Sequence, residues 1–124
     1  MKLDRTLRIT NAVKPGLLPR YVEKNEQFVN RMSTISGFGL DNTGWPSPVM
    51  KYTDLKIISN SACVPYFGII DKSVLCAKSM DSKASTCQGD SGSSLTLKEP
   101  GVAVVVGVVS YGHGAGCDKG ELEG

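Results

Sequence analysis

The chain has 124 residues and a mass of 13.2 kDa, which suffices for one compact domain and is too short for two well-filled cores. Its 14 basic and 12 acidic side chains leave a formal net charge of +2, too weak a field to indicate a nucleic-acid partner. The longest apolar run covers residues 102–109 and is less than half of the roughly 18–20 residues that a membrane helix needs, so we expect no membrane partner.

Short β-like stretches separated by turn residues recur along the chain, without repeats or a long helical periodicity. Residues 6–10 alternate polar and apolar side chains, and the prolines and glycine of 15–19 then predict an extended, irregular connection. We predict strands over residues 28–38, 50–58, 73–77, 94–98 and 102–111. A short helix or turn is expected near 60–66. Because the run at 102–111 is almost entirely β-branched, we expect it to be buried, and the fold class is all-β.

Four cysteines, Cys63, Cys76, Cys87 and Cys117, lie in glycine- and serine-rich surroundings and form no C-x-x-C pair of the kind that binds zinc. Their even number predicts two disulfides and no metal site. Disulfides belong to an oxidising compartment, which indicates a secreted protein. The start of the chain has no apolar stretch of about 7–15 residues and therefore no signal peptide, so we expect that the beginning of the natural protein is missing.

The clearest chemical signal is Cys-Gln-Gly-Asp-Ser-Gly at residues 87–92, where glycines flank a serine that a tight loop would present to a substrate. Further motifs accompany it in order: Ser-Gly-Phe-Gly at 36–39, Leu-Cys-Ala at 75–77, Val-Ser-Tyr-Gly at 109–112 and Gly-Cys at 116–117. With these motifs the chain resembles the C-terminal half of a chymotrypsin-like (trypsin-family, S1) serine protease. The resemblance covers essentially the whole chain, and the glycine-rich tail is most similar to invertebrate chymotrypsin-like and collagenolytic members.

This resemblance implies the second antiparallel β-barrel of the chymotrypsin-like fold, in an incomplete form. Residues 1–27 then correspond to the segment that connects the two barrels, and residues 28–124 to a C-terminal barrel truncated at both ends. The N-terminal barrel is missing from this chain. We expect the uncovered apolar faces to promote aggregation.

The resemblance also implies the residues that carry the chemistry. Ser91 corresponds to the nucleophile, and the backbone N–H groups of Gly89 and Ser91 to the oxyanion hole, where glycine leaves room for its amide to face the developing negative charge. Asp90 corresponds to the acid that pairs with a newly cut N-terminal ammonium on activation. Because this chain holds no such terminus, we expect Asp90 to turn outwards and the oxyanion loop to be disordered or collapsed.

A substrate pocket follows from the same correspondence. It would be formed by Ser85, Gln88, Ser110, Tyr111, Gly112 and Glu123. An uncharged Ser85 at the floor and an open wall at Gly112 favour large apolar or aromatic side chains at the cleavage position, whereas Glu123 would instead attract basic ones. The family also implies the pairings Cys63 with Cys76 and Cys87 with Cys117. Segment 110–112 would pair with the substrate backbone.

A serine nucleophile needs a base, and His113, the single histidine of the chain, follows Ser91 in the glycine loop where the family has no catalytic histidine. The base and its aspartate belong to the half that the chain lacks. We therefore expect a serine endopeptidase by family, inactive as an isolated chain and without a cofactor. Its partners would be protein or peptide substrates and protein inhibitors of proteases. A non-catalytic homologue acting as a secreted binding or regulatory module is the alternative.

Overall fold

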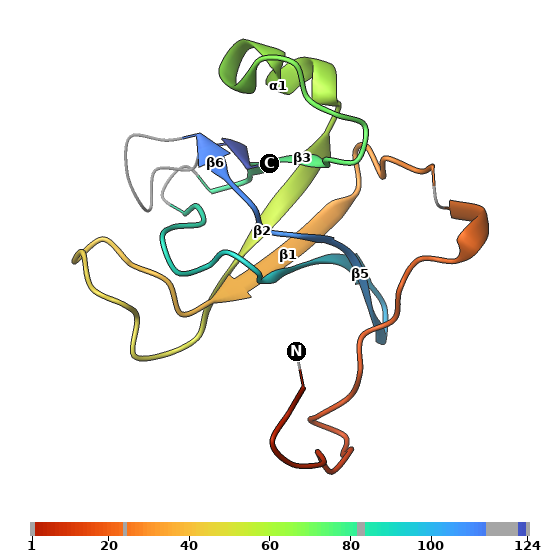
Figure 1. Ribbon diagram of the computed structural model, residues 1–124, viewed down its shortest axis with the longest axis vertical. Helices are drawn as coiled ribbons and strands as arrows, with labels where there is room; N and C mark the ends of the chain where they lie inside the picture. Colours follow the sequence, from red (N-terminus) through yellow and green to blue (C-terminus); the bar gives the residue numbers. More distant parts are fainter. Residues whose placement is uncertain (1, 24, 82–83, 114–121, 124) are drawn as a thin grey trace.

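The computed structural model describes residues 2–23, 25–81, 84–113 and 122–123, and its centre is an antiparallel β-sheet (Figure 1). The elements in chain order are η1 (Tyr21–Glu23), β1 (Met32–Gly37), β2 (Lys51–Ile58), α1 (Asn60–Phe67), β3 (Cys76–Ser79), β4 (Ser94–Glu99), β5 (Val102–Val108), β6 (Gly112–His113) and β7 (Leu122–Glu123). The strands lie in the order β5-β4-β1-β2-β3-β7-β6, so the described sheet is open. The all-β prediction and the short helix are confirmed.

Several strand boundaries differ from the prediction: β5 ends at Val108 rather than at 111, and two strands begin three or four residues late for local reasons. The first strand begins at Met32 rather than at 28, because Phe28 and Asn30 have φ angles of 51° and 70°, in the left-handed region where a strand cannot continue. The third begins only at Cys76, after a turn in which the Val74 N–H donates to the Asp71 carbonyl.

The sheet buries one face through strict alternation along β1, β2 and β4. This core consists of Ile35, Leu55, Ile57, Ala77, Leu95 and Leu97. Strand β1 lies between β2 and β4, so that Ser33 is opposite Leu55 on one side and Leu97 on the other. The Ser33 side chain is fully buried and its hydroxyl donates to the Leu55 carbonyl at 3.1 Å, which satisfies the buried polar group.

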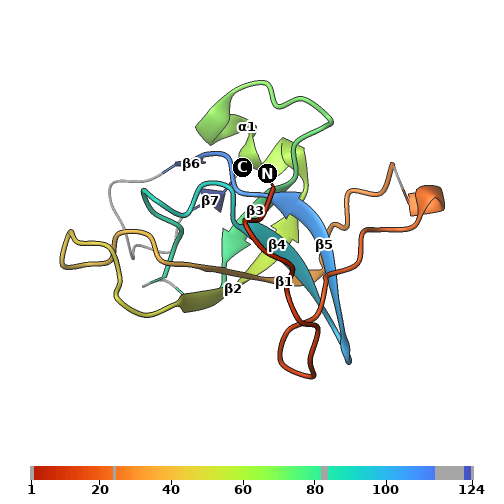
Figure 2. The same ribbon diagram turned by 60° about the horizontal axis from the view of Figure 1, so that its bottom comes forward.

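Strand β5 is an edge strand, and the expectation that its valine-rich run is buried is wrong. Val102 is 44% exposed and Val108 is 65% exposed, because β5 pairs only with β4 within the described sheet (Figure 2). One residue of the N-terminal segment protects this edge. The Leu17 N–H donates to the Ala103 carbonyl and the Val105 N–H donates to the Leu17 carbonyl, both at 2.8 Å, in a parallel bridge.

Helix α1 is linked to the sheet by the disulfide between Cys63 and Cys76, which confirms the first predicted pairing. Both cysteines are fully buried, and their Cα atoms are 6.6 Å apart. The helix ends at Phe67, and the following Gly68 has φ of 74° and ψ of −150°, a combination that glycine adopts readily because it lacks a Cβ atom. Cys87 is also disulfide-bonded, and its predicted partner Cys117 lies outside the described residues.

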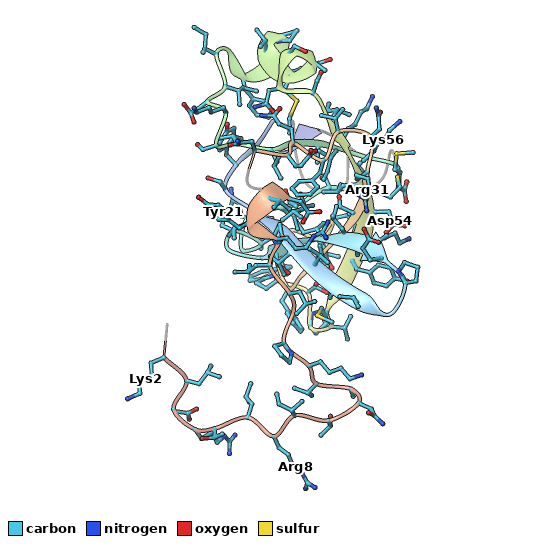
Figure 3. The ribbon with its side chains drawn as sticks, turned by 90° about the vertical axis from the view of Figure 1, so that its right-hand side faces the viewer. Lys2, Arg8, Tyr21, Arg31, Asp54 and Lys56 are labelled. Carbon is cyan, nitrogen blue, oxygen red and sulfur yellow. A yellow bond between two sulfur atoms is a disulfide. The ribbon has the colours of Figure 1, made fainter. Side chains whose placement is uncertain are left out.

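The segment before residue 15 leaves the sheet as an extended strap that carries Lys2 and Arg8 far from the body of the molecule (Figure 3). The residues of 6–10 form no strand, and Leu7 and Ile9 are 56% and 61% exposed. The irregular connection predicted for residues 15–19 is confirmed, apart from the single bridge at Leu17. Among the described helices, none has the length and apolar character required to cross a membrane.

Candidate active site

Residues 87–92, which we name the oxyanion loop after their predicted role, consist of two consecutive turns. In the first, the Asp90 N–H donates to the Cys87 carbonyl at 3.0 Å, and in the second the Ser93 N–H donates to the Asp90 carbonyl at 3.0 Å. The third residue of each turn is a glycine, with φ of 96° at Gly89 and 88° at Gly92. A β-turn with positive φ at this position requires glycine for steric reasons, so the glycine spacing determines the loop's shape.

Ser91 is the second residue of the second turn, lies between the two glycines in sequence and is exposed to solvent. Hydrogen bonds to two other parts of the chain hold the loop around it. The Leu40 N–H donates to the Gln88 carbonyl at 2.8 Å, and the Gly92 N–H donates to the Val109 carbonyl at 2.9 Å. The predicted nucleophile is therefore presented on a loop that is supported on both sides.

The backbone N–H groups of Gly89 and Ser91 donate no hydrogen bond to any residue in the described part of the chain. Such unsatisfied donors are available to a ligand, and two of them beside a serine hydroxyl suit an oxygen that becomes negatively charged. An oxyanion hole needs two donors of this kind.

The carboxylate of Asp90 points into the protein, so the expectation that it turns outwards is wrong. Its Oδ1 accepts the Gly39 N–H at 2.8 Å, and its Oδ2 accepts the Cys87 N–H at 3.0 Å. The sequence-based expectation considered only an ammonium as the partner, whereas backbone N–H groups also satisfy a carboxylate. The second glycine of the motif Ser-Gly-Phe-Gly at 36–39 supplies one of the two donors.

A cavity of about 90 Å³ adjoins this carboxylate. Ser85, the predicted pocket floor, lines it together with Asp90, and the Ser85 hydroxyl is buried without a hydrogen-bond partner among the described residues. Ser110 lines a different cavity, of about 290 Å³, beside Leu75 and Val108. The structure thus places these two predicted pocket residues on separate cavities.

Of the other predicted pocket residues, Gly112 and Glu123 lie on the short strands β6 and β7, Tyr111 directly precedes β6, and Gln88 belongs to the oxyanion loop. Gly112 is directly opposite Glu123 in the sheet, so these two predicted walls are brought together at the level of the backbone. The Tyr111 ring packs edge-on against Phe67 of α1, with centroids 5.2 Å apart and planes at 76°. The side chains of His113 and Glu123 lie outside the description.

The loop between β1 and β2 borders the same cavity as Asp90 and is ordered by Asp41. The Thr43 hydroxyl and N–H and the Lys51 ammonium donate to the Asp41 carboxylate and lower its pKa to about 2. These contacts fix the backbone just beyond Gly39. Within the described ranges, no group of three or more histidine, cysteine, aspartate or glutamate side chains is placed to hold a metal ion.

Comparison with known proteins adds an independent line of evidence. A family model described as Trypsin matches residues 1–124. A collagenase of Hypoderma lineatum is 37% identical over 117 residues, which are 93% of this chain and 43% of that protein. The mouse transmembrane protease serine 7 is 40% identical over 72 residues, covering 56% of this chain and 9% of that protein.

A solved structure of HL collagenase matches the fold with a TM-score of 0.79 and 32% identity, over 96% of this chain and 50% of that chain. The chain therefore spans half or less of the relatives it matches. These similarities agree with the observed sheet and with the exposed serine between two glycines in indicating the same family. The chain belongs to the trypsin family of serine proteases and has its chymotrypsin-like fold.

Proposed function

We propose that this chain is the nucleophile-bearing part of a serine endopeptidase. Ser91 would attack the substrate carbonyl, and the N–H groups of Gly89 and Ser91 would bind the oxygen that becomes negatively charged. One such donor is typically worth about 3–4 kcal/mol of activation free energy. The observation that carries the proposal is the pair of N–H groups, of Gly89 and of the exposed Ser91 itself, that no described residue engages.

The general base would come from polypeptide outside these 124 residues. His113 is the single histidine of the chain, and its backbone is committed to pairing with Leu122 between β6 and β7. A serine hydroxyl without a base is a poor nucleophile at neutral pH, so hydrolysis by the isolated chain would be negligible. Peptide and protein substrates, and protein inhibitors that bind like substrates, would lie along residues 110–112.

The cleavage preference follows from the uncharged pocket floor. Ser85 offers no carboxylate for a basic side chain, so large apolar or aromatic residues are the favoured substrates at the cleavage position. A contribution of Glu123 would shift the preference towards lysine and arginine. The disulfides and the family of extracellular-type proteases support a secreted location.

Labelling by a fluorophosphonate, which forms a covalent bond with an activated serine, tests this proposal. We expect no labelling of residues 1–124 alone and clear labelling of a longer form that supplies a histidine and an aspartate. Labelling should disappear in Ser91→Ala and persist in the neighbouring Ser93→Ala. Reactivity of the short chain, or a longer form that does not react, would contradict the proposal, and the second result would favour a non-catalytic binding module.

A further inference from the structure

We propose that Gly37 and Gly39 are positioning residues for the oxyanion loop and that they act through the Asp90 carboxylate. The inference rests on the proposed function, since it concerns how the same loop is held. It assigns a task to two glycines that have no part in the chemistry itself. It also means that hydrogen bonds from the chain's own backbone, from the Gly39 and Cys87 N–H groups to the Asp90 carboxylate, hold the loop in place. We call this set of contacts the latch.

The contacts between the two segments form a continuous set. The Gly39 N–H donates to the Asp90 Oδ1 atom at 2.8 Å, and the next N–H, of Leu40, donates to the Gln88 carbonyl at 2.8 Å. On the loop side, the Cys87 N–H donates to the Asp90 Oδ2 atom at 3.0 Å. Both carboxylate oxygens are thus engaged by backbone donors, one on each side of the contact.

The space for the carboxylate exists only because both residues lack a side chain. A Cβ added at Gly39 would lie 2.6 Å from each Asp90 oxygen and from the carboxyl carbon, and a Cβ added at Gly37 would overlap the Oδ1 atom even more closely. Contacts this short do not occur for real Cβ atoms, so the carboxylate would have to leave. Any residue larger than glycine at either position therefore displaces Asp90.

Backbone conformation does not explain these glycines. Gly89 and Gly92 have positive φ angles, which only glycine adopts without strain, but Gly37 and Gly39 have none. Gly37 and Gly39 are therefore explained by the space that the Asp90 carboxylate occupies and not by their backbone angles. Asp90 also forms no ion pair with a cation among the residues that the structure describes.

Hydrogen exchange of individual amides, followed by NMR on the 124-residue chain, tests the latch without using catalysis. In Asp90→Ala, the Gly39 and Cys87 amides should exchange at least about tenfold faster, because each loses its acceptor. The decisive readout is Cys87 in the Gly37→Ala variant. That substitution touches neither Cys87 nor its hydrogen bond directly, so faster exchange there reports displacement of the carboxylate. Gly107→Ala is the matched control, because its Cβ would meet only ordinary contacts of 3.5 Å or more.

A second background separates the latch from general damage to the fold. In the Asp90→Ala background, adding Gly37→Ala should change neither Cys87 exchange nor the unfolding equilibrium constant by more than about twofold. In the native background, the same Gly37→Ala substitution should increase the unfolding equilibrium constant by about tenfold or more. Asp90→Asn, which keeps the side-chain volume, should speed exchange at only one of the two amides, because its NH₂ group cannot accept a hydrogen bond.

Unchanged Cys87 exchange in Gly37→Ala, or unchanged exchange at both Gly39 and Cys87 in Asp90→Asn, would overturn the inference. So would a Gly37→Ala penalty that is equally large with and without the carboxylate. Failure of the proposed function looks different, since it would leave the exchange results intact while a longer form fails to react with fluorophosphonate.

Discussion

The disulfide between Cys63 and Cys76 should supply a large part of the stability of this small domain. The two cysteines are 13 residues apart in sequence, so the bond closes a short loop in the unfolded chain. In the chain-entropy model, a loop of this length corresponds to about 3 kcal/mol of unfolding free energy. Because domains of this size are stable by only about 5–15 kcal/mol, replacing both cysteines by alanine should lower the urea midpoint strongly.

The single variants make this prediction sharper. Cys63→Ala alone breaks the cross-link as completely as the double substitution, so the single and double variants should agree within about 1 kcal/mol. The assay is urea denaturation followed by circular dichroism, with Ser61→Ala on the exposed side of the same helix as a control that should change the free energy by less than about 0.5 kcal/mol. A double variant as stable as the native chain, or a penalty that doubles from one substitution to two, would refute the reasoning.

Three further predictions follow from burial, charge and backbone geometry. Leu55→Ala should lower the free energy of unfolding by about 2–5 kcal/mol because its side chain is fully buried, whereas Val108→Ala at the exposed edge should cost far less, as urea denaturation would show. The hydrogen bond from Lys98 lowers the pKa of Asp54, so this pair stabilises the fold above about pH 4, and the stabilisation is lost as the pH falls through the lower folded-state pKa. Measurement of the unfolding free energy against pH should show that Asp54→Asn removes this small contribution, which is below about 1 kcal/mol. Gly89→Ala should reduce fluorophosphonate labelling of a reactive longer form by about 100-fold or more, because the φ of 96° is strained for alanine and its methyl would meet backbone at 3.2 Å.

The parts of the fold that depend on alternation were predictable from sequence. Leu55 and Ile57, and likewise Leu95 and Leu97, are separated by one polar residue and share the buried face of the sheet. The order of the strands was not predictable in the same way. It decides that β5 lies at an edge, and it therefore decides how far the valines of that strand are exposed.

The site divides along the same line. The turns around Ser91 come from local glycine spacing, which a sequence displays directly. The orientation of Asp90 depends on Gly39, which lies 51 residues away in the chain. The outward orientation of Asp90 was expected because the chain holds no newly cut N-terminal ammonium, but a carboxylate also accepts backbone N–H groups, and these have no signature in the sequence.

The bridge formed by Leu17 affects the tendency of the chain to aggregate. This residue occupies the middle of the outer edge of β5, a valine-rich strand that otherwise offers its backbone to any passing strand. Leu17 therefore blocks this part of the β5 edge from pairing with a strand of another molecule. Proteolytic cleavage between Leu17 and β1, for example at the exposed Tyr21 and Val22, would release Leu17 and leave the β5 edge open to fibril growth.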